Sequence, residues 1–227
     1  MPAIPLVITQ KKSHASPHPL DMIHDSGDGF SIRSSPGVLG QVDRVSGATA
    51  LQWIWESDDF YIHMGEVVLQ QNYGAAQDNS LTCIFSATKA ITSAASWLLM
   101  QEKVISENDL VSDYIPGFGE NGKAKTTLSH LLTHTAGFPH APFRPIEWKS
   151  KEARLRRFEQ WRSFWEPGTK FDYHPSSSMY VVAEIIERAS GQNFESFVKD
   201  HILNPLQLRN TFIGLPDEQS SRALPIK

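Results

Sequence analysis

One hairpin followed by a long series of helical segments most constrains the fold of this chain. Two apolar runs, at 60–63 and 67–69, flank a Gly-containing turn and predict a pair of antiparallel strands. Beyond the hairpin, apolar spacing and capping residues predict helices at 86–101, 126–134, 148–165, 177–189 and 194–203. Because an isolated pair of strands is marginally stable, it needs the helical part to pack against. We therefore predict an α+β fold.

The chain has 227 residues, of which 40% are hydrophobic, and a net charge of −4. Its Lys and Arg residues are scattered, so we predict neither a nucleic-acid nor a membrane partner. Residues 1–50 are rich in Ser, Pro, Gly and His without periodicity, which predicts a poorly ordered arm before a domain at 51–227. No signal peptide or membrane-spanning run is evident, so we expect a cytoplasmic protein.

The helix predicted at 86–101 carries the most informative pair of residues. It is apolar on all sides, which predicts a buried helix. Ser86 and Lys89 lie three residues apart in its first turn and therefore share one face. A serine needs a base to become a nucleophile, and a helix N-terminus favours an oxyanion. Ser-x-x-Lys alone also occurs at ordinary helix starts, but a lysine in a buried helix favours an acyl-transfer site.

A second cluster lies in the loop at 171–176, before the helix predicted at 177–189. Tyr173 and His174 are its titratable ring residues. A tyrosine next to a lysine can carry a proton to a leaving group. The alternative from the loop alone is that Tyr173 is merely packed and His174 is hydrogen-bonded locally.

His130 and His134 are four residues apart, which is the spacing of a two-histidine metal face. However, Leu131 stands where such a motif has Glu, and no third ligand is evident. We therefore interpret both histidines as structural and predict neither a metal nor another cofactor.

With these segments assembled, the chain resembles the serine beta-lactamase-related family. This group includes class C beta-lactamases, penicillin-binding carboxypeptidases and family VIII-type esterases. Order and spacing agree from about residue 60 to residue 216. The words that carry the resemblance lie at 85–90 (Phe-Ser-Ala-Thr-Lys-Ala), 110–116, 128–139 (with Leu-Leu-Thr-His-Thr-Ala-Gly), 167–173 and 185–191.

The resemblance implies a beta-lactamase/transpeptidase-like fold and a serine hydrolase or acyltransferase that acts on a small ester or amide. It implies that Ser86 is the acylated nucleophile and that Lys89 is its partner base. Tyr173 corresponds to the tyrosine of the family's Tyr-x-Asn element, which activates the serine or protonates the leaving group. The backbone N–H of Ser86 would be one oxyanion-hole donor. The resemblance gives His134 a structural place in the wall of the site and no catalytic role.

Two departures from the family pattern change the expectation. Pro175 stands where the family has Asn, so His174 or Ser176 is expected to replace that amide in substrate binding. This change favours an esterase over a beta-lactamase. The family's third motif does not follow Tyr173, so the chain looks C-terminally truncated, with only the first two strands of the sheet. The alternative is therefore a catalytically impaired fragment or pseudoenzyme, and the oligomeric state stays open.

Overall fold

The structure is a computed structural model, and it describes residues 6–8, 58–63, 66–72 and 74–225. The chain divides into two compact units, which are considered separately. The larger unit comprises Met1–Ile8 and Cys83–Ser220, and the smaller comprises Thr9–Thr82 and Ser221–Lys227. Apart from residues 6–8, the arm predicted at 1–50 lies outside the described residues, as does its boundary at residue 51. Both stay predictions.

The smaller unit contains the expected hairpin. Strand β2 (Asp58–His63) pairs antiparallel with β3 (Glu66–Asn72), and the register shifts between Tyr61 and Ile62. In the same unit, the Leu81 N–H donates to the carbonyl of Arg222 at 2.8 Å, and Leu81 forms an isolated parallel bridge with Ala223. The strand pair predicted from two apolar runs around a Gly-containing turn is therefore confirmed.

Outside the hairpin, the structure contains short strands that were not predicted from the sequence. In the larger unit, β1 (Leu6–Ile8) pairs antiparallel with β5 (Thr211–Ile213), and Val7 lies opposite Phe212. Strand β4 (Thr82–Cys83) lies at the boundary of the two units. Segments of two or three residues are too short to show a period-2 pattern, which explains why they escape sequence analysis.

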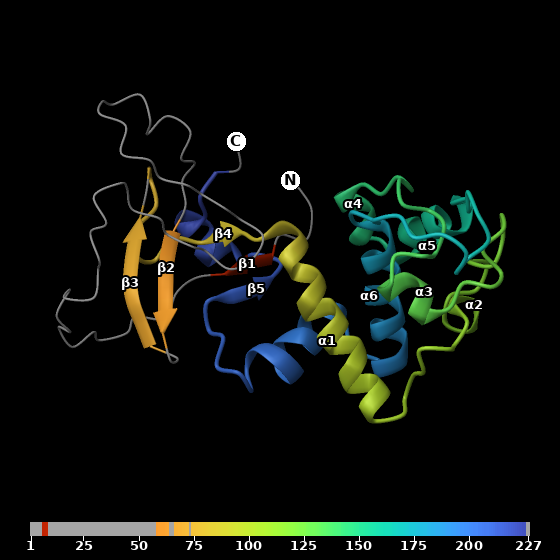
Figure 1. Cartoon of the computed structure of the whole chain (residues 1–227), viewed down its shortest axis with the longest axis horizontal. Helices are drawn as coiled ribbons and strands as arrows, with labels where there is room; N and C mark the ends of the chain where they lie inside the picture. The colour runs from red at the N-terminus through yellow and green to blue at the C-terminus, as the bar shows by residue number, and fades with distance from the viewer. Residues whose placement is uncertain (1–5, 9–57, 64–65, 73, 226–227) are drawn as a thin grey trace, which may run out of the picture. The chain divides into compact units, whose positions relative to one another are not determined.

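The larger unit is otherwise helical (Figure 1). Its fully buried core includes Leu131, Phe138, Phe158, Val181 and Ile185. Helix α6 packs against α1, α3 and α7, so it lies at the centre of this unit. The helical elements are η2 (Phe85–Ala87), α1 (Thr88–Gln101), α2 (Val111–Tyr114), α3 (Leu128–Leu132), α4 (Pro145–Trp148), α5 (Lys151–Gln160), α6 (Ser177–Ser190), α7 (Phe194–Val198), η3 (Lys199–Leu203) and η4 (Asp217–Arg222).

The prediction that α1 is buried on all sides is wrong. Its buried residues are spaced as one helical face, and Trp97 on another face is 63% exposed. Ala, Ser and Thr make up half of this helix, and such small side chains gain little free energy from burial. Apolar composition therefore does not demand a buried helix here. The buried face consists of Thr92, Ala95, Ser96 and Leu99.

The helix predicted at 148–165 is wrong in its bounds, because α4 ends at Trp148 and α5 covers only Lys151–Gln160. Ser150 caps α5 by accepting a hydrogen bond from the backbone N–H of Ala153 at 3.2 Å, so a new helix begins after α4. At the other end, Trp161 is extended, with φ −64° and ψ 145°. The charged amphipathic pattern indicates the middle of α5 but not where it ends.

A buried lysine side chain donates hydrogen bonds to the backbone carbonyls at the C-terminal end of α5. The side chain of Lys123 is only 1% exposed, and its ammonium donates to the carbonyls of Glu120 at 2.6 Å, of Glu159 at 3.3 Å and of Trp161. Burial lowers the pKa of Lys123 to about 8. A cation suits the C-terminal end of a helix, whose last carbonyls lack intrahelical partners. Lys123 therefore satisfies the backbone where α5 stops.

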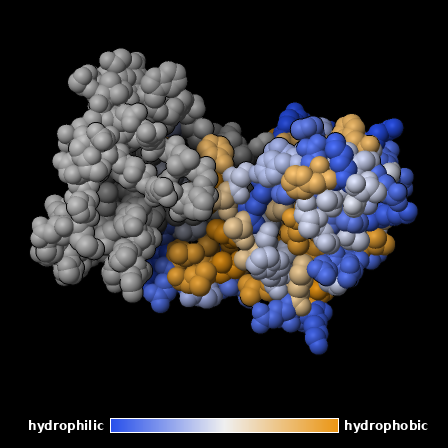
Figure 2. All heavy atoms as spheres, viewed as in Figure 1, coloured by the Kyte–Doolittle hydropathy of each residue, from blue (hydrophilic) through white to orange (hydrophobic). Residues whose placement is uncertain are grey.

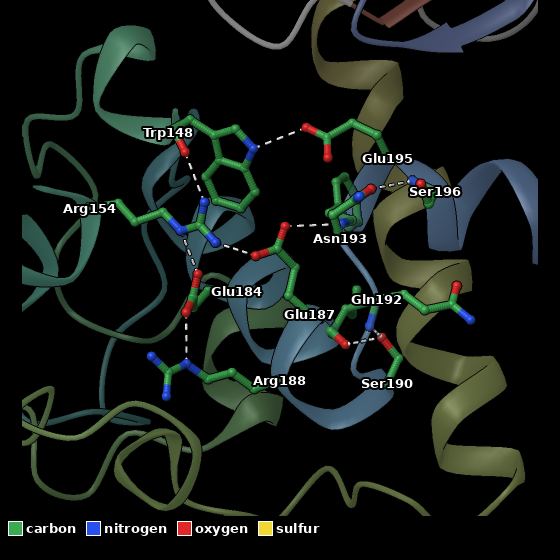
Figure 3. Close-up of polar contacts among 12 residues, drawn as sticks. Trp148, Arg154, Glu184, Glu187, Arg188, Ser190, Gln192, Asn193, Glu195 and Ser196 are labelled. Atoms are coloured by element: carbon green, nitrogen blue, oxygen red, sulfur yellow. Dashed lines mark hydrogen bonds and ion pairs between the residues drawn. The ribbon is translucent and has the colours of Figure 1, made fainter. Parts of the chain in front are cut away.

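Buried ion pairs hold α6 against the neighbouring helices (Figure 3). Arg154 of α5 donates to Glu184 at 2.5 Å and to Glu187, and its third contact is the Trp148 carbonyl at 2.8 Å. Glu184 also accepts from Arg188 at 2.7 Å. The guanidinium lies over the Trp148 ring, with Cζ 4.2 Å from the ring centroid. These contacts fix α6, whose N-terminal end follows the Tyr173 loop.

On the face seen in Figure 2, apolar areas alternate with polar ones over the coloured part of the chain. The most exposed large apolar side chains are Phe85, Phe164, Phe171 and Leu206, each 65–70% exposed. None of the helices within the described ranges combines the length and the apolar character that a bilayer crossing requires.

Candidate active site

Ser86 lies in a tight turn that leads into α1. The turn is the 3₁₀ helix η2, in which the Ala87 N–H donates to the Ile84 carbonyl at 3.0 Å. Phe85 has a φ of +44°, a left-handed conformation that is uncommon for a bulky residue. Strained residues of this kind cluster at functional sites. The Ser86 side chain is exposed at the start of the helix, as a nucleophile requires.

Lys89 lies one turn further along the same face. Its half-buried side chain donates from Nζ to Ser86 Oγ at 3.0 Å and to the Pro175 carbonyl at 2.7 Å. The first contact follows from the i, i+3 spacing, and the second joins α1 to the loop before α6. Lys89 is therefore held by both segments of the candidate site.

Tyr173 completes the group from the other segment. Its hydroxyl donates to Ser86 Oγ at 2.7 Å, and Lys89 Nζ lies 4.8 Å from the centroid of its ring. Burial acts to raise the pKa of Tyr173, but hydrogen bonding with Lys89 and Ser86 and the positive charge of Lys89 outweigh it. The net effect lowers the pKa of Tyr173 below its ordinary value. The structure thus brings together the three residues predicted as catalytic.

His174 and Ser176, predicted to bind substrate, occupy different environments. His174 is fully buried, and both ring nitrogens are engaged: Nε2 accepts from the Phe138 N–H at 3.1 Å, and Nδ1 lies 2.6 Å from the Asp172 carbonyl oxygen. Ser176 is exposed at the N-cap of α6, where its side chain makes no capping hydrogen bond. In this arrangement His174 fixes the loop, and Ser176 is the one of the two with an exposed hydroxyl.

At Pro175, where the family has Asn, the backbone rather than a side chain contacts Lys89. The Pro175 carbonyl oxygen accepts from Nζ, as described above, although the proline side chain has no polar atom. A backbone carbonyl leaves no trace in the residue type, so sequence analysis missed this contact. Neither His174 nor Ser176 makes it.

The two histidines considered for a metal face are separated by the fold. α3 ends at Leu132, and His134 lies beyond it with a φ of +60°. His130 Nδ1 accepts from the Thr127 N–H at 3.2 Å in a capping box, whereas the His134 ring centroid lies 4.8 Å from that of Tyr173. The resemblance to the family implies a structural place for His134 and no role in the reaction. The Thr-His-Thr-Ala-Gly word around it was the available signal.

Comparisons with known proteins agree with the resemblance seen in the sequence. A family model described as Beta-lactamase matches residues 60–225. A beta-lactamase of Yersinia enterocolitica is 28% identical over 159 residues, which cover 66% of this chain and 40% of that protein. The chain thus spans about two fifths of the length of this curated relative.

Solved structures of two related proteins share the fold. A family VIII carboxylesterase superposes with a TM-score of 0.60 at 25% identity, covering 66% of this chain and 42% of the other. A penicillin-binding protein homologue from Caulobacter crescentus also gives a TM-score of 0.60, at 26% identity, covering 72% of this chain and 46% of the other. The expected beta-lactamase/transpeptidase-like fold is therefore confirmed, and the chain belongs to the beta-lactamase family.

Proposed function

We propose that this chain carries the nucleophile and the proton-transfer group of a serine hydrolase or acyltransferase that acts on small esters or amides through a Ser86 acyl-enzyme. The observation that carries the proposal is the shared contact at Ser86 Oγ, which lies 3.0 Å from Lys89 Nζ and 2.7 Å from the Tyr173 hydroxyl. A nucleophile and a base within hydrogen-bond reach, with a third group orienting the base, form the signature of covalent catalysis.

We base the roles within this triad on its electrostatics. Burial opposes ionisation of Tyr173, but its hydrogen bonds with Lys89 and Ser86 and the positive charge of Lys89 lower its pKa and so favour the phenolate. Tyr173 therefore acts as the general base towards Ser86 and as the general acid towards the leaving group. Lys89 acts as the cation that orients both oxygens, held in place by the Pro175 carbonyl.

The proposed reaction has two steps, acylation of Ser86 and then deacylation. The Tyr173 phenolate takes the Ser86 proton as Oγ bonds to the substrate carbonyl carbon, and the carbonyl oxygen becomes an oxyanion. The tetrahedral intermediate expels the alkoxide or amine, which takes the proton from Tyr173, and the acyl group stays on Ser86. Water or an acceptor alcohol then attacks the acyl-enzyme by the reverse sequence, with Tyr173 accepting its proton.

Small esters are the preferred substrates in this proposal. Lys89 is met by a backbone carbonyl rather than by a side-chain amide, so a donor that could bind a substrate amide is missing at Pro175. The exposed rings of Phe85 and Phe171 adjoin the proposed catalytic segments and favour an apolar acyl or alcohol group. The similarity to a solved family VIII carboxylesterase supports the same substrate class.

Covalent labelling tests the proposal directly. We expect a fluorophosphonate probe to modify one serine, which peptide mass spectrometry will identify as Ser86. Ser86→Ala should abolish labelling, whereas Ser220→Ala, which changes an exposed serine of η4, should leave it unchanged. p-Nitrophenyl acetate should be hydrolysed faster than nitrocefin. Folded protein without labelling, or equal labelling of Ser86→Ala, would instead support the alternative of a non-catalytic family member.

A further inference from the structure

His134 contacts the Tyr173 loop although the proposed reaction assigns it no step. It follows α3 in a left-handed conformation, and its side chain is half-buried. The centroid of its ring lies 4.8 Å from that of Tyr173 and 6.2 Å from that of Phe171. The ring of His134 therefore forms one wall against which the phenol of Tyr173 rests.

Two hydrogen bonds attach His134 to the loop on either side of Tyr173. The Asp172 N–H donates to the His134 carbonyl at 3.1 Å. The His174 N–H donates to His134 Nδ1, also at 3.1 Å. One residue thus binds the backbone immediately before and immediately after Tyr173, in addition to packing against its ring.

The second bond requires an unprotonated Nδ1, because a protonated imidazolium has no acceptor. Burial and then the positive charge of Lys89 lower the pKa of His134 below its ordinary value, which favours this neutral form. The titratable or charged groups around the ring are Lys89 from α1 and Tyr173 and His174 from the loop.

His174, which is buried, also holds the Tyr173 loop through both of its ring nitrogens. Because its Nε2 accepts from the Phe138 N–H, its proton lies on Nδ1, which donates to the Asp172 carbonyl. Burial lowers its pKa most, with His134 and His140 adding to that effect and Asp172 opposing it. The loop carrying Tyr173 is therefore held by two imidazoles that must both be neutral.

We infer that His134 is a positioning residue whose neutral ring holds Tyr173 against Ser86, and that its protonation in acid releases Tyr173 and switches the site off. An unfolded or open loop gives His134 its ordinary pKa of ~6.5, so the open state takes up the proton first. The closed state therefore has its full stability above pH ~6.5, and opening becomes more favourable as the pH falls from there towards the lower pKa that His134 has in the closed state. The inference rests on the proposed function for its consequence but not for its geometry.

Tyrosine NMR tests the geometry without any turnover. In protein labelled with ¹³Cζ-tyrosine, with Tyr173→Phe identifying the signal, Tyr173 should titrate below its ordinary pKa of ~10. In His134→Ala the titration should move up to that value, because the phenol leaves Lys89 and Ser86. An unchanged titration in folded His134→Ala would overturn the inference. The remaining tyrosine signals report whether the variant is folded.

A conservative variant separates positioning from simple stability. Asn tolerates a positive φ, and its Oδ1 replaces Nδ1 as an acceptor that does not titrate in this pH range. Protonation of Tyr173 itself slows labelling of both proteins as the pH falls, so the readout is the ratio of the wild-type rate to the His134→Asn rate. That ratio should be close to 1 at pH 7.5 and should fall below pH ~6.5, where only wild type also protonates residue 134. At pH 7.5, where wild type is closed, His134→Ala should label at least ~10-fold more slowly than wild type, within the range of general base effects. His201→Asn, which changes an exposed histidine of η3, should retain the wild-type profile.

The outcomes are distinct for the two proposals. If wild type is never labelled but the Tyr173 titration depends on His134, the proposed function fails and the positioning role holds. If the ratio of the wild-type rate to the His134→Asn rate stays constant below pH ~6.5, His134 is not the group that titrates and the switch is refuted. If His134→Ala does not fold, the profile of His134→Asn decides the question alone.

Discussion

Gly137 shows at the scale of a single residue how closely the His134 segment is packed. Its φ is +94°, and an added Cβ would overlap Ser163 Oγ and lie 2.8 Å from the Trp165 carbonyl oxygen. Gly191, at the end of α6, has a φ of +73° but has open space where a Cβ would be. Both glycines adopt a left-handed backbone that would strain any residue with a Cβ, but only Gly137 is crowded.

Alanine substitution of these glycines therefore separates strain from overlap. Gly191→Ala should destabilise by about 1 kcal/mol, the cost of a left-handed alanine. Gly137→Ala should cost more, by about 1–3 kcal/mol in addition, because the neighbouring chain must move. Urea denaturation measures both, and equal losses of stability would contradict the crowding argument. Gly137→Ala should also slow labelling of Ser86, since the strained segment carries His134.

Residue identity predicted part of the candidate site. Ser86, Lys89 and Tyr173 were all predicted, because their side chains carry the chemistry and their spacing places them in known positions of a family pattern. The Pro175 carbonyl was not predicted, because every residue has one and only the path of the chain decides where it points. His134 was placed near the site but without a role, since its contacts are to the loop backbone.

At the scale of elements, Arg154 links the helices that support the site. It is buried and joins α5 to two glutamates of α6, of which Glu184 is fully buried. Removing one partner of a buried ion pair leaves an uncompensated charge, which is far more costly than the pair is stabilising. α6 therefore depends on this one side chain of α5.

Replacing Arg154 tests that dependence. Arg154→Met should reduce the free energy of unfolding by about 3–5 kcal/mol, since Glu184 would keep only Arg188 as a cation. Arg156→Met is the matched control, because Arg156 lies two residues away on the exposed side of α5, and it should change stability by less than about 0.5 kcal/mol. Chemical denaturation of both variants provides the measurement. Similar losses would mean that the network is not a principal support of α6.

Elements were predictable where local signals are strong. The helix at 177–189 was expected nearly as found, because its apolar period is clear and Gly191 ends it in a left-handed conformation. The exposed face of α1 and the end of α5 were not predicted, because they depend on what packs against each helix. The Lys123 ammonium that receives the last carbonyls of α5 lies 38 residues from Trp161, beyond the reach of any local pattern.

At the scale of the whole molecule, the chemical reactivity of the Lys123 amine measures how often the fold opens. Its amine is buried among three carbonyls, whereas Lys103 is exposed beyond the end of α1. Reductive methylation of native protein should modify Lys123 at least ~10-fold more slowly than Lys103, because the reagent reaches it only after local unfolding. In denaturant the two rates should become equal. Similar rates in native protein, measured by peptide mass spectrometry, would contradict the burial of Lys123.

The contact between Ser86 and Tyr173 has a consequence for synthesis of the chain, because 87 residues separate them. At translation rates of ~5–20 residues per second, the nucleophile leaves the peptidyl-transferase centre about 4–17 s before its proton acceptor. During that interval the nascent chain carries a serine that has no phenolate to activate it. The proposed reactivity therefore arises only after synthesis has passed the loop, so Ser86 cannot react with an ester by this mechanism while the chain is shorter.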